Sequence, residues 1–392
     1  MTSAVLPTYS RANMSFETGE GSWLIARDGT RYLDLGAGIA VTGLGHAHPA
    51  LVKVLQDQAG ALWHTSNLYQ IPHQEALAQK LSDATFADTM FFTNSGAEAM
   101  ECAIKMARKY WYDKGQPDRV NIITFTGSFH GRTLATISAA GSEKLTKGFG
   151  PLVEGFINLP AGDHEALQDA LDDTIAAVIV EPVQGEGGII PLPDACLKGL
   201  RDMCDTTGAL LVFDEIQCGV GRTGKLFAHE WAGVTPDIMA IAKGIGNGFP
   251  LGACLATEEA ASGMTAGTHG STYGGNPLAC AVGSAVMDIV ADHDFLSEVS
   301  RKSGLLRQSL EGLVASHPTI FELVRGAGLM IGLKCVVPNS DVVNACYDTH
   351  LLTVPGGDNV IRLLPAMTIS DDEIKEAVAR LHRAATALEG TQ

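Results

Sequence analysis

The sequence predicts an α/β fold with a large, mainly parallel sheet and a smaller α+β domain. Short apolar runs that include β-branched residues, such as 176–180 and 209–213, have the composition of strands buried on both faces. Segments with a helical spacing of apolar residues separate these runs, and this alternation is typical of a parallel sheet. Several runs end on polar residues and glycine-rich loops, where open α/β sheets place their ligand sites.

The individual elements can be assigned in order along the chain. A hairpin is expected around Arg27-Asp28-Gly29, because an Asp-Gly pair lies between alternating apolar runs. Helices are expected at 49–61 and 72–81, after Ser95, at 193–207, 278–290, 295–316 and 340–350, and from 371 onward. Strands are expected to end at 92, to cover 120–125, 176–180, 209–213, 237–242, 251–256, 329–335 and 360–364, and to lie near 321.

The length of 392 residues allows one large domain and a smaller one. Hydrophobic residues make up 46% of the chain and charged residues 18%, so there is ample material for a core. We expect residues 61–295 to form the large domain and residues 296–392 to form the small α+β domain. Residues 1–60 are expected to be an N-terminal segment that contributes to the small domain.

The composition excludes several classes of partner. The formal net charge of -17 argues against binding to nucleic acid or to an anionic membrane. The N-terminus lacks the basic start and apolar stretch of a signal peptide, and no apolar run approaches the ~20 residues that span a bilayer. The eight cysteines include no C-x-x-C pair and are expected to be reduced core residues. A soluble cytoplasmic enzyme is therefore expected.

Two reactive side chains stand at the ends of predicted strands. The run 209–213 stops on Asp214 and Glu215, and the run 237–242 stops on Lys243. A strand-end lysine usually extends its amine to water. Lys243, however, precedes a loop with glycines at 244, 246 and 248, which lets a bulky group lie against the backbone. A lysine that bonds to the aldehyde of pyridoxal phosphate, with a carboxylate that keeps the ring nitrogen protonated, suits this arrangement.

Four motifs together resemble those of the class III pyridoxal-phosphate-dependent aminotransferases. They are DEIQ at 214–217, the lysine before the glycine-rich turn, SGAE at 95–98 and GSFHGRT at 127–133. The resemblance runs from about residue 13 to the C-terminus. It implies the aspartate aminotransferase-like fold (fold type I), with a large, mainly parallel-sheet domain and a smaller α+β domain.

The resemblance also implies which residues hold pyridoxal 5'-phosphate. Lys243 would carry it, Asp214 would face its ring nitrogen and Gln217 its ring hydroxyl, with Glu215 and Ile216 in the same binding segment. The phosphate would lie at Gly96 and Ala97, at the start of a helix whose backbone N–H groups and dipole favour anions. Phe129 would stack on the ring. Thr272 would reach the phosphate of the neighbouring subunit's cofactor, so the expected enzyme is a homodimer with shared active sites.

The same resemblance implies the substrate-binding residues. Arg132 would bind a substrate carboxylate, for which the planar guanidinium fork is suited. Arg362 would be a second carboxylate-binding arginine, and Glu186 would pair with it as a gate between two substrates. Ser271 would lie near the substrate.

The implied reaction moves the terminal amino group of an ω-amino acid to 2-oxoglutarate. N-acetylornithine is the expected donor, and succinylornithine, ornithine, succinyl-diaminopimelate and 4-aminobutyrate remain alternatives. An aminomutase of the same fold and a non-catalytic cofactor-binding protein are further rivals.

Two other motifs have simpler explanations. Residues 219–224 match the G-x-G-x-x-G pattern of nicotinamide oxidoreductases, but no helical period follows them, so a chance match is the better interpretation. His46 and His48 have no third ligand at a useful spacing, and we expect no metal site there.

Overall fold

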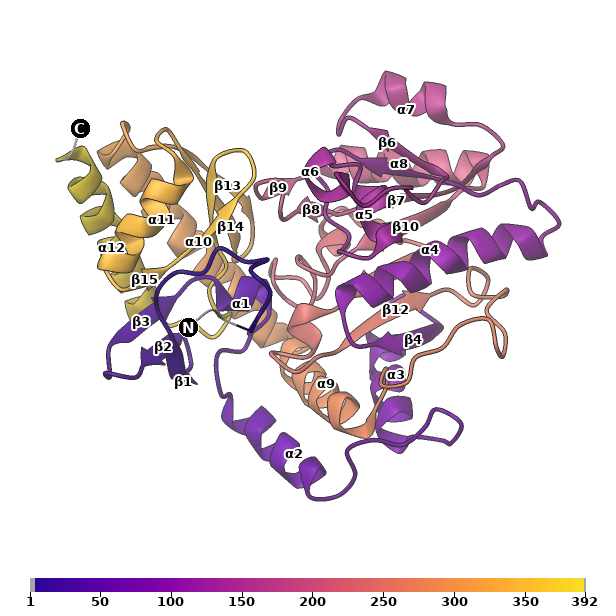
Figure 1. The fold of residues 1–392 in the computed structure, drawn as a ribbon, viewed down its shortest axis with the longest axis horizontal. Coiled ribbons are helices and arrows are strands. Elements are labelled where there is room, and N and C mark those ends of the chain that lie inside the picture. The colour runs from indigo at the N-terminus through magenta and orange to yellow at the C-terminus, as the bar shows by residue number, and fades with distance from the viewer. Residues whose placement is uncertain (1–3, 391–392) are drawn as a thin grey trace.

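The computed structural model describes residues 4–390, which form two lobes (Figure 1). The larger lobe contains a seven-stranded sheet, and the smaller lobe combines the C-terminal residues with the first three strands of the chain. The fold class predicted from the sequence, a large mainly parallel sheet with a smaller α+β part, is confirmed.

The large sheet has the strand order β4-β12-β11-β10-β7-β5-β6. Only β12 runs antiparallel to its neighbours, so the carboxyl ends of the other six strands share one edge. The strand bounds are β4 Thr89–Thr93, β5 Asn121–Phe125, β6 Phe156–Leu159, β7 Ile175–Val180, β10 Leu210–Asp214, β11 Ile238–Ile241 and β12 Gly252–Ala256.

Both faces of this sheet are buried, which explains why its central strands are continuously apolar. On β10, Leu211 and Phe213 belong to one hydrophobic core, whereas Leu210 and Val212 belong to another. Helix α4 (Gly96–Asp113) supplies much of the second core, and α8 (Asp194–Thr207) packs into the first. The alternation of side chains along a strand sends successive residues to opposite layers.

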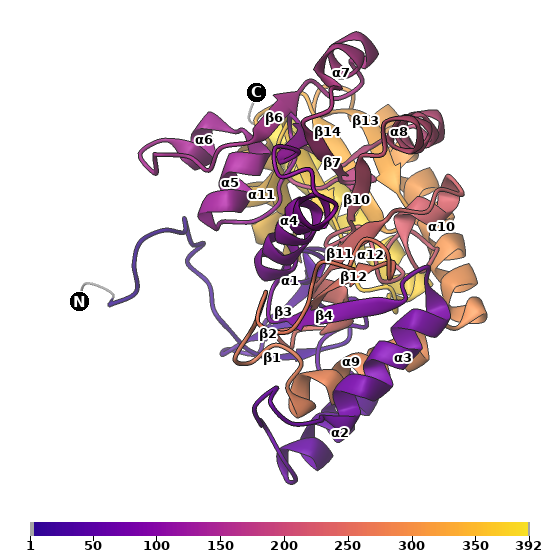
Figure 2. The ribbon, with the colours of Figure 1, turned by 90° about the vertical axis from the view of Figure 1, so that its right-hand side faces the viewer.

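Three helices form the base of the large lobe in both views (Figures 1 and 2). Helices α2 (Pro49–Ala59) and α3 (Pro72–Ala84) both contact α9 (Pro277–Val290). The remaining elements outside the small-lobe sheets are shorter. The helices are α1 Ala37–Ala40, α5 Leu134–Ala140, α6 Glu143–Thr146, α7 His164–Ala170, η1 Ala228–Trp231 and η2 Lys243–Ile245, and strands β8 Val183–Gln184 and β9 Ile190–Pro191 form a two-stranded sheet.

The small lobe contains two four-stranded sheets. The first has the order β13-β14-β17-β16, and the second, β1-β2-β3-β15, joins the N-terminal strands to a C-terminal strand. The bounds are β1 Phe16–Glu20, β2 Trp23–Ala26, β3 Arg31–Asp34, β13 Phe321–Ala327, β14 Met330–Cys335, β15 Leu351–Leu352, β16 Val354–Gly356, β17 Val360–Leu363, α10 His293–Ser316, α11 Asn339–Asp348 and α12 Asp371–Glu389. This pairing physically links residues near the two ends of the chain.

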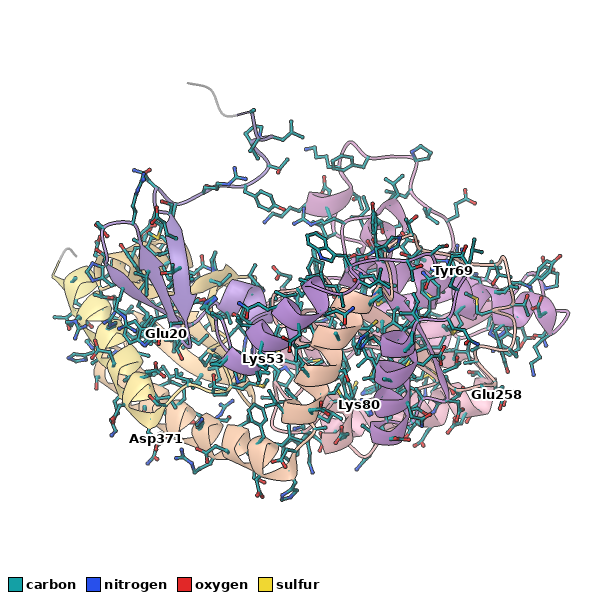
Figure 3. The ribbon with its side chains drawn as sticks, turned by 90° about the horizontal axis from the view of Figure 1, so that it is seen from below. Glu20, Lys53, Tyr69, Lys80, Glu258 and Asp371 are labelled. Carbon is teal, nitrogen blue, oxygen red and sulfur yellow. The ribbon has the colours of Figure 1, made fainter. Side chains whose placement is uncertain are left out.

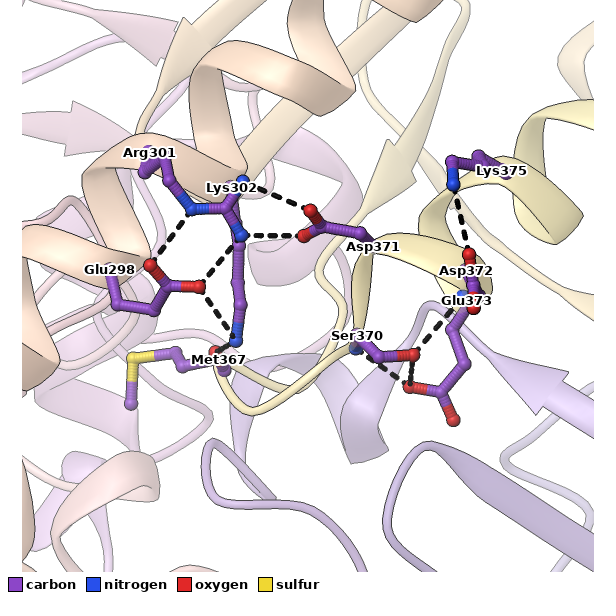
Figure 4. A network of polar contacts seen from close by, with 9 residues as sticks. All are labelled: Glu298, Arg301, Lys302, Met367, Ser370, Asp371, Asp372, Glu373 and Lys375. Carbon is purple, nitrogen blue, oxygen red and sulfur yellow. Dashed lines mark hydrogen bonds and ion pairs between the residues drawn. The ribbon is translucent and has the colours of Figure 1, made fainter.

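A polar network ties α10 to the start of α12 (Figure 4). The guanidinium of Arg301 donates to the carboxylates of Glu298 and Asp371, at 2.7 and 2.5 Å for the Nη2 contacts. Ser370 caps α12, and Glu373 accepts a hydrogen bond from the Ser370 backbone N–H. These groups are exposed and lie on the outside of the small lobe.

The helices and strands expected from the sequence are present with bounds that differ by a few residues, but strand β6 and helices α5 and α6 were not predicted. The cap of α4 is Ser95, as expected, but Glu98 accepts from the backbone N–H of Asn94 and not from that of Ser95. Residues 219–224 form turns, followed only by the short 3₁₀ helix η1. A Cβ at Gly221 would collide with Val290, so this segment is packed against the protein and offers no dinucleotide cradle.

Within residues 4–390, no helix is long and apolar enough to cross a membrane. The eight cysteines are free thiols, and all except the half-buried Cys196 are buried. In the same range, no cluster of three or more His, Cys, Asp or Glu side chains is placed to hold a metal ion. His46 instead contacts Asp34, with 2.8 Å between Nε2 and Oδ2.

Candidate active site

A cavity of about 370 Å³ lies where the parallel strands of the large sheet end. The segments that follow five of these strands contribute to it: Asn94 to Ala97 after β4, Phe129 to Arg132 after β5, Glu181 after β7, Asp214, Ile216 and Gln217 at β10, and Ala242 and Lys243 after β11. A cavity of about 400 Å³ between α7 and α8 is lined by no lysine or arginine. The sheet-edge cavity is therefore the candidate active site.

The register of β10 and β11 brings Asp214 and Lys243 to this cavity. Asp214 pairs with Ala240, so the chain reaches Lys243 three residues beyond that pair. Lys243 opens a 3₁₀ turn with a left-handed backbone, φ +50°, which a non-glycine residue adopts only at a cost of about 1–3 kcal/mol. Such strain is typical of functional positions.

The surroundings of Lys243 change the pKa of its amine. Burial lowers its pKa below the ordinary lysine value, and the carboxylates of Glu186 and Asp214 oppose this shift. No described residue forms a hydrogen bond with its Nζ. A neutral amine is nucleophilic, so the lowered pKa suits covalent chemistry.

Asp214 is held by two partners. Its Oδ2 lies 2.8 Å from Nδ1 of the buried His130, and its Oδ1 accepts from the backbone N–H of Ile216 at 3.1 Å. Burial would lower the pKa of His130, but the contact with Asp214 raises it above the ordinary value. The Asp214 side chain is only 3% exposed, so His130 and the Ile216 N–H are the groups that hold its carboxylate in position.

Glu181 is a second buried carboxyl group beside this pair. Its oxygens accept from the backbone N–H groups of Phe129 and Gly185, at 2.8 and 3.0 Å. Burial and the charge of Asp214 raise the pKa of Glu181 to about 7. Glu181 thereby ties together two loops that line the cavity.

The start of α4 forms another wall. Ser95, Gly96 and Ala97 line the cavity, and the first N–H groups of a helix have no intrahelical partner. A Cβ at Gly96 would lie 2.8 Å from the side chain of Ile216, so glycine is required for the helix to pack this closely.

Phe129 and Arg132 lie on the β5 side of the cavity. The Arg132 guanidinium lies 5.5 Å from the centre of the Phe129 ring. The side chain of Arg132 is exposed, and no ion pair joins it to another residue in the described part of the chain. It is therefore available to a ligand carboxylate.

Arg362 comes from β17 of the small lobe and forms an ion pair with Glu186 of the β8–β9 loop. Its Nη2 also donates to the backbone oxygen of Pro355, at 3.0 Å. Only 3% of the Arg362 side chain is exposed, against 36% for Glu186. Glu186 can thus move toward solvent more easily than Arg362.

Five site residues named from the sequence do not line the cavity: Glu186 and Arg362, which form the ion pair described above, and Glu215, Ser271 and Thr272. The carboxylate of Glu215 accepts from the backbone N–H groups of Ala228 and His229, each at 2.8 Å, and its contacts anchor helix η1. Of the two adjacent acids, only Asp214 faces the cavity, because successive side chains of a strand point to opposite sides. Ser271 and Thr272 line a neighbouring hollow, and Ser271 Oγ lies 3.4 Å from Asn94 Nδ2.

Comparisons with known proteins agree with this geometry. Residues 7–385 match the class-III aminotransferase family. The chain belongs to the class-III aminotransferases. It is 66% identical to an acetylornithine aminotransferase of Rhodobacter capsulatus, over 99% of each chain.

Two solved structures show the same fold. An N-acetylornithine aminotransferase from Stenotrophomonas maltophilia superposes with a TM-score of 0.87 at 39% identity, and the match covers 98% of each chain. An ornithine aminotransferase from Toxoplasma gondii superposes with a TM-score of 0.95 at 30% identity, covering 99% of this chain and 94% of that one.

This class-III aminotransferase depends on pyridoxal 5'-phosphate, and the residues of its cavity fit that cofactor. The Oε1 atom of Gln217 is buried without a described partner, as expected of an acceptor that awaits a ligand hydroxyl. The N-terminus of α4 suits a phosphate, Asp214 a pyridinium nitrogen, and Lys243 an aldehyde. A Cβ at Gly185 would lie 2.4 Å from the Gln217 amide, so glycine makes room for it.

Sequence reasoning missed His130 and Glu181 as site residues. His130 lies inside the GSFHGRT motif, and Glu181 directly follows strand 175–180, so the position of each residue in the sequence could have indicated a role in the site. Their importance depends on the contacts with Asp214, Phe129 and Gly185, which only the fold reveals.

Replacing Glu181 by glutamine should change how stability depends on pH. The pKa of Glu181 in the folded protein, about 7, exceeds the ordinary 4.5, so the folded wild type binds a proton that the unfolded chain releases. The free energy of unfolding therefore falls as pH rises from about 4.5 to 7, by up to ~1.4 kcal/mol per unit. In Glu181→Gln the side chain does not titrate, so this pH-dependent contribution to the free energy of unfolding is absent. Urea unfolding at several pH values in this window measures the difference, and a pH-independent difference contradicts the assignment.

Proposed function

We propose that this enzyme transfers the terminal amino group of N-acetylornithine to 2-oxoglutarate, giving N-acetylglutamate semialdehyde and glutamate. The observation that carries the proposal is the unequal state of two arginines: Arg132 lines the cavity, and Arg362 lies outside its lining but close enough to Lys243 to lower the pKa of that amine. Arg132 is exposed at the cavity and makes no ion pair with a described residue, whereas Arg362 is neutralised by Glu186. One arginine is free for a carboxylate and the other is masked.

The donor needs one carboxylate-binding group far from its reacting amine. N-acetylornithine reacts at its terminal amine, so its carboxylate lies at the opposite end of the molecule. Arg132 at the cavity wall can hold that carboxylate by two parallel hydrogen bonds. Glu186 covers Arg362 during this step and prevents the carboxylate from binding there.

The second substrate needs the other arginine. Glutamate and 2-oxoglutarate react at their α-carbon, so the α-carboxylate must lie next to the reacting centre. Movement of the half-exposed Glu186 away from Arg362 would uncover the guanidinium for it. One cavity would then accept both partners in turn.

Lys243 supplies the acid–base chemistry. Pyridoxal phosphate, when bound, provides the electron sink that makes the donor carbon acidic. The Nζ atom of Lys243 would act as the general base that takes the proton from the carbon bearing the reacting amine, and then as the general acid that gives this proton back. The carboxylate of Asp214, held in position by its contact with His130, would face the ring nitrogen of the cofactor.

A donor panel tests this proposal. We expect the highest kcat/KM with N-acetylornithine among succinylornithine, ornithine, succinyl-diaminopimelate and 4-aminobutyrate, with 2-oxoglutarate as acceptor. Lys243→Ala should lose turnover while its circular dichroism stays that of the wild type. A different preferred donor overturns the substrate assignment. If Lys243→Ala still transaminates, the catalytic role of Lys243 is wrong. Turnover of the donor without formation of glutamate would indicate an aminomutase.

Replacing Arg132 by lysine should weaken the acylated donors selectively. Lysine keeps the charge but cannot form two parallel hydrogen bonds to a carboxylate. The loss of one of these hydrogen bonds should lower kcat/KM for acylated donors roughly 10- to 100-fold. The kinetics with glutamate, which we assign to Arg362, should change much less. Equal kcat/KM values for acylated donors in the wild type and the variant remove Arg132 from the substrate site.

We also propose that the enzyme is a cytoplasmic homodimer with shared sites. The loop between α2 and α3 exposes Trp63 and Leu68, at 65% and 87%, and Tyr273 is exposed beside Thr272. Figure 3 views the molecule from the side of these helices, with Lys53 on α2, Tyr69 in the loop and Lys80 on α3 labelled. A second copy that covers this apolar loop would bring Ser271 and Thr272 to its partner's site.

Replacing Thr272 by valine tests the shared site. The change removes the hydroxyl that we assign to the partner's cofactor phosphate, so the Kd for pyridoxal phosphate should rise roughly 10-fold. Thr268→Val is the matched control in the same loop, because its hydroxyl bonds only to the backbone oxygen of Thr265. Fluorescence titration measures affinity and sedimentation measures mass. A monomer at micromolar concentration, or an unchanged Kd, contradicts the shared site.

A further inference from the structure

The loop that carries Glu186 is held from the opposite lobe. Residues 185–189 connect β8 to β9 in the large lobe, yet several of their polar partners lie in the small lobe, on β13, on β17 and in the turn between β16 and β17. The backbone N–H of Gly357 donates to the carbonyl oxygen of Glu186 at 2.8 Å. Arg325 Nε donates to the carbonyl oxygen of Gly188 at 2.7 Å.

Arg325 is itself oriented by a carboxylate. Its Nη1 lies 2.8 Å from Oδ2 of Asp358, and Lys334 pairs with the other oxygen of the same group. The contacts from Lys334 and Arg325 hold the pKa of Asp358 below the ordinary value, so the carboxylate is charged at neutral pH. Arg325 therefore joins the Glu186 loop to the turn that contains Gly357 and Asp358.

The two segments touch so closely that their contact depends on glycines. A Cβ at Gly188 would lie 2.5 Å from Arg325 Nη2 and 2.6 Å from the carbonyl oxygen of Gly357. A Cβ at Gly357 would lie 2.8 Å from the carbonyl oxygen of Glu186. The loop is thus held at the Glu186 carbonyl and at Gly188, and Glu181 holds the Gly185 N–H on the other side of Glu186, so the backbone has little freedom while these contacts persist.

We propose that Arg325 and Asp358 form a latch that holds the backbone of the Glu186 loop, so that the Glu186 side chain alone moves between its paired and unpaired positions. The latch sets the preference between the two substrates. This inference rests on the proposed function, in which Glu186 masks Arg362 for the ω-amino donor and uncovers it for glutamate. Arg325 is a positioning residue, because its contacts are with Gly188 and Asp358 and it is absent from the cavity lining.

Loss of the latch should affect the two half-reactions differently. When Arg325 no longer holds Gly188, the whole loop can drift and Glu186 leaves Arg362 more often. An uncovered Arg362 favours the α-carboxylate of glutamate and allows the donor carboxylate to bind in the wrong place. The donor half-reaction should therefore lose efficiency while the glutamate half-reaction keeps or gains it.

Separate measurement of the two half-reactions tests the latch. The absorbance change of the bound cofactor follows each one in the holoenzyme, with the preferred ω-amino donor and with glutamate. For Arg325→Gln we expect the ratio of kcat/KM for the donor to kcat/KM for glutamate to fall roughly tenfold, the loss expected for one charge-assisted hydrogen bond. Asp358→Asn should lower the ratio in the same direction, and Arg325→Lys should restore part of it.

Arg301→Gln is the matched control. Arg301 is also a small-lobe arginine that pairs with acids, Glu298 and Asp371, but these lie on the outer surface (Figure 4). Its loss should leave the ratio unchanged. If Arg325→Gln lowers both half-reactions equally, or leaves the ratio within twofold of the wild type, the latch is wrong and Arg325 serves only the contact between lobes.

Hydrogen exchange gives a readout that does not depend on activity. In Arg325→Gln, the backbone amides of residues 186–189 and of Gly357 should exchange faster, whereas those of the central strands should not change. Unchanged exchange in 186–189 overturns the latch. A wild type that rejects N-acetylornithine refutes the proposed donor, but the ratio for its best ω-amino donor and the exchange rates still decide whether the latch exists.

Discussion

The parallel register of the large sheet is the constraint on which the rest of the structure depends. Six strands end at one edge, so residues that lie between positions 94 and 243 meet around a single cavity. The pairing of Asp214 with Ala240 is the critical contact, because it fixes the acid at the end of β10 relative to Lys243 beyond β11. A slip of β10 by one residue would move the Asp214 side chain to the other face of the sheet, away from Lys243.

The electrostatics of the cavity follow from burying charges of both signs together. Lys243, His130 and Glu181 are buried around Asp214, and the charge of Asp214 contributes to the pKa shift of each of them. His130 gains affinity for protons from Asp214, Glu181 gains it from burial, and Lys243 loses it from burial. One pocket therefore contains a histidine and a glutamic acid with raised pKa values and a lysine with a lowered pKa, and perturbed pKa values of this kind are typical of sites that transfer protons.

Much of this could be predicted from the sequence. The apolar strands, the Ser95 cap and the strand-end positions of Asp214 and Lys243 follow from local patterns, because each depends on neighbours in the chain. The contacts of Glu215 with Ala228 and His229 and of Arg325 with Gly188 could not be predicted, since each joins segments brought together only by the tertiary fold. The same holds for the pairing of Arg362 with Glu186, which motif resemblance suggested but periodicity could not.

The proposed chemistry requires that the cofactor is attached covalently to Lys243. Reduction of the holoenzyme with borohydride, followed by proteolysis and peptide mass mapping, locates the residue that carries the cofactor. We predict that the added mass lies on the peptide that contains Lys243, at that side chain and at no other lysine. Added mass on a different lysine, or none in a protein that has kept its cofactor absorbance until reduction, would contradict the assignment of the site.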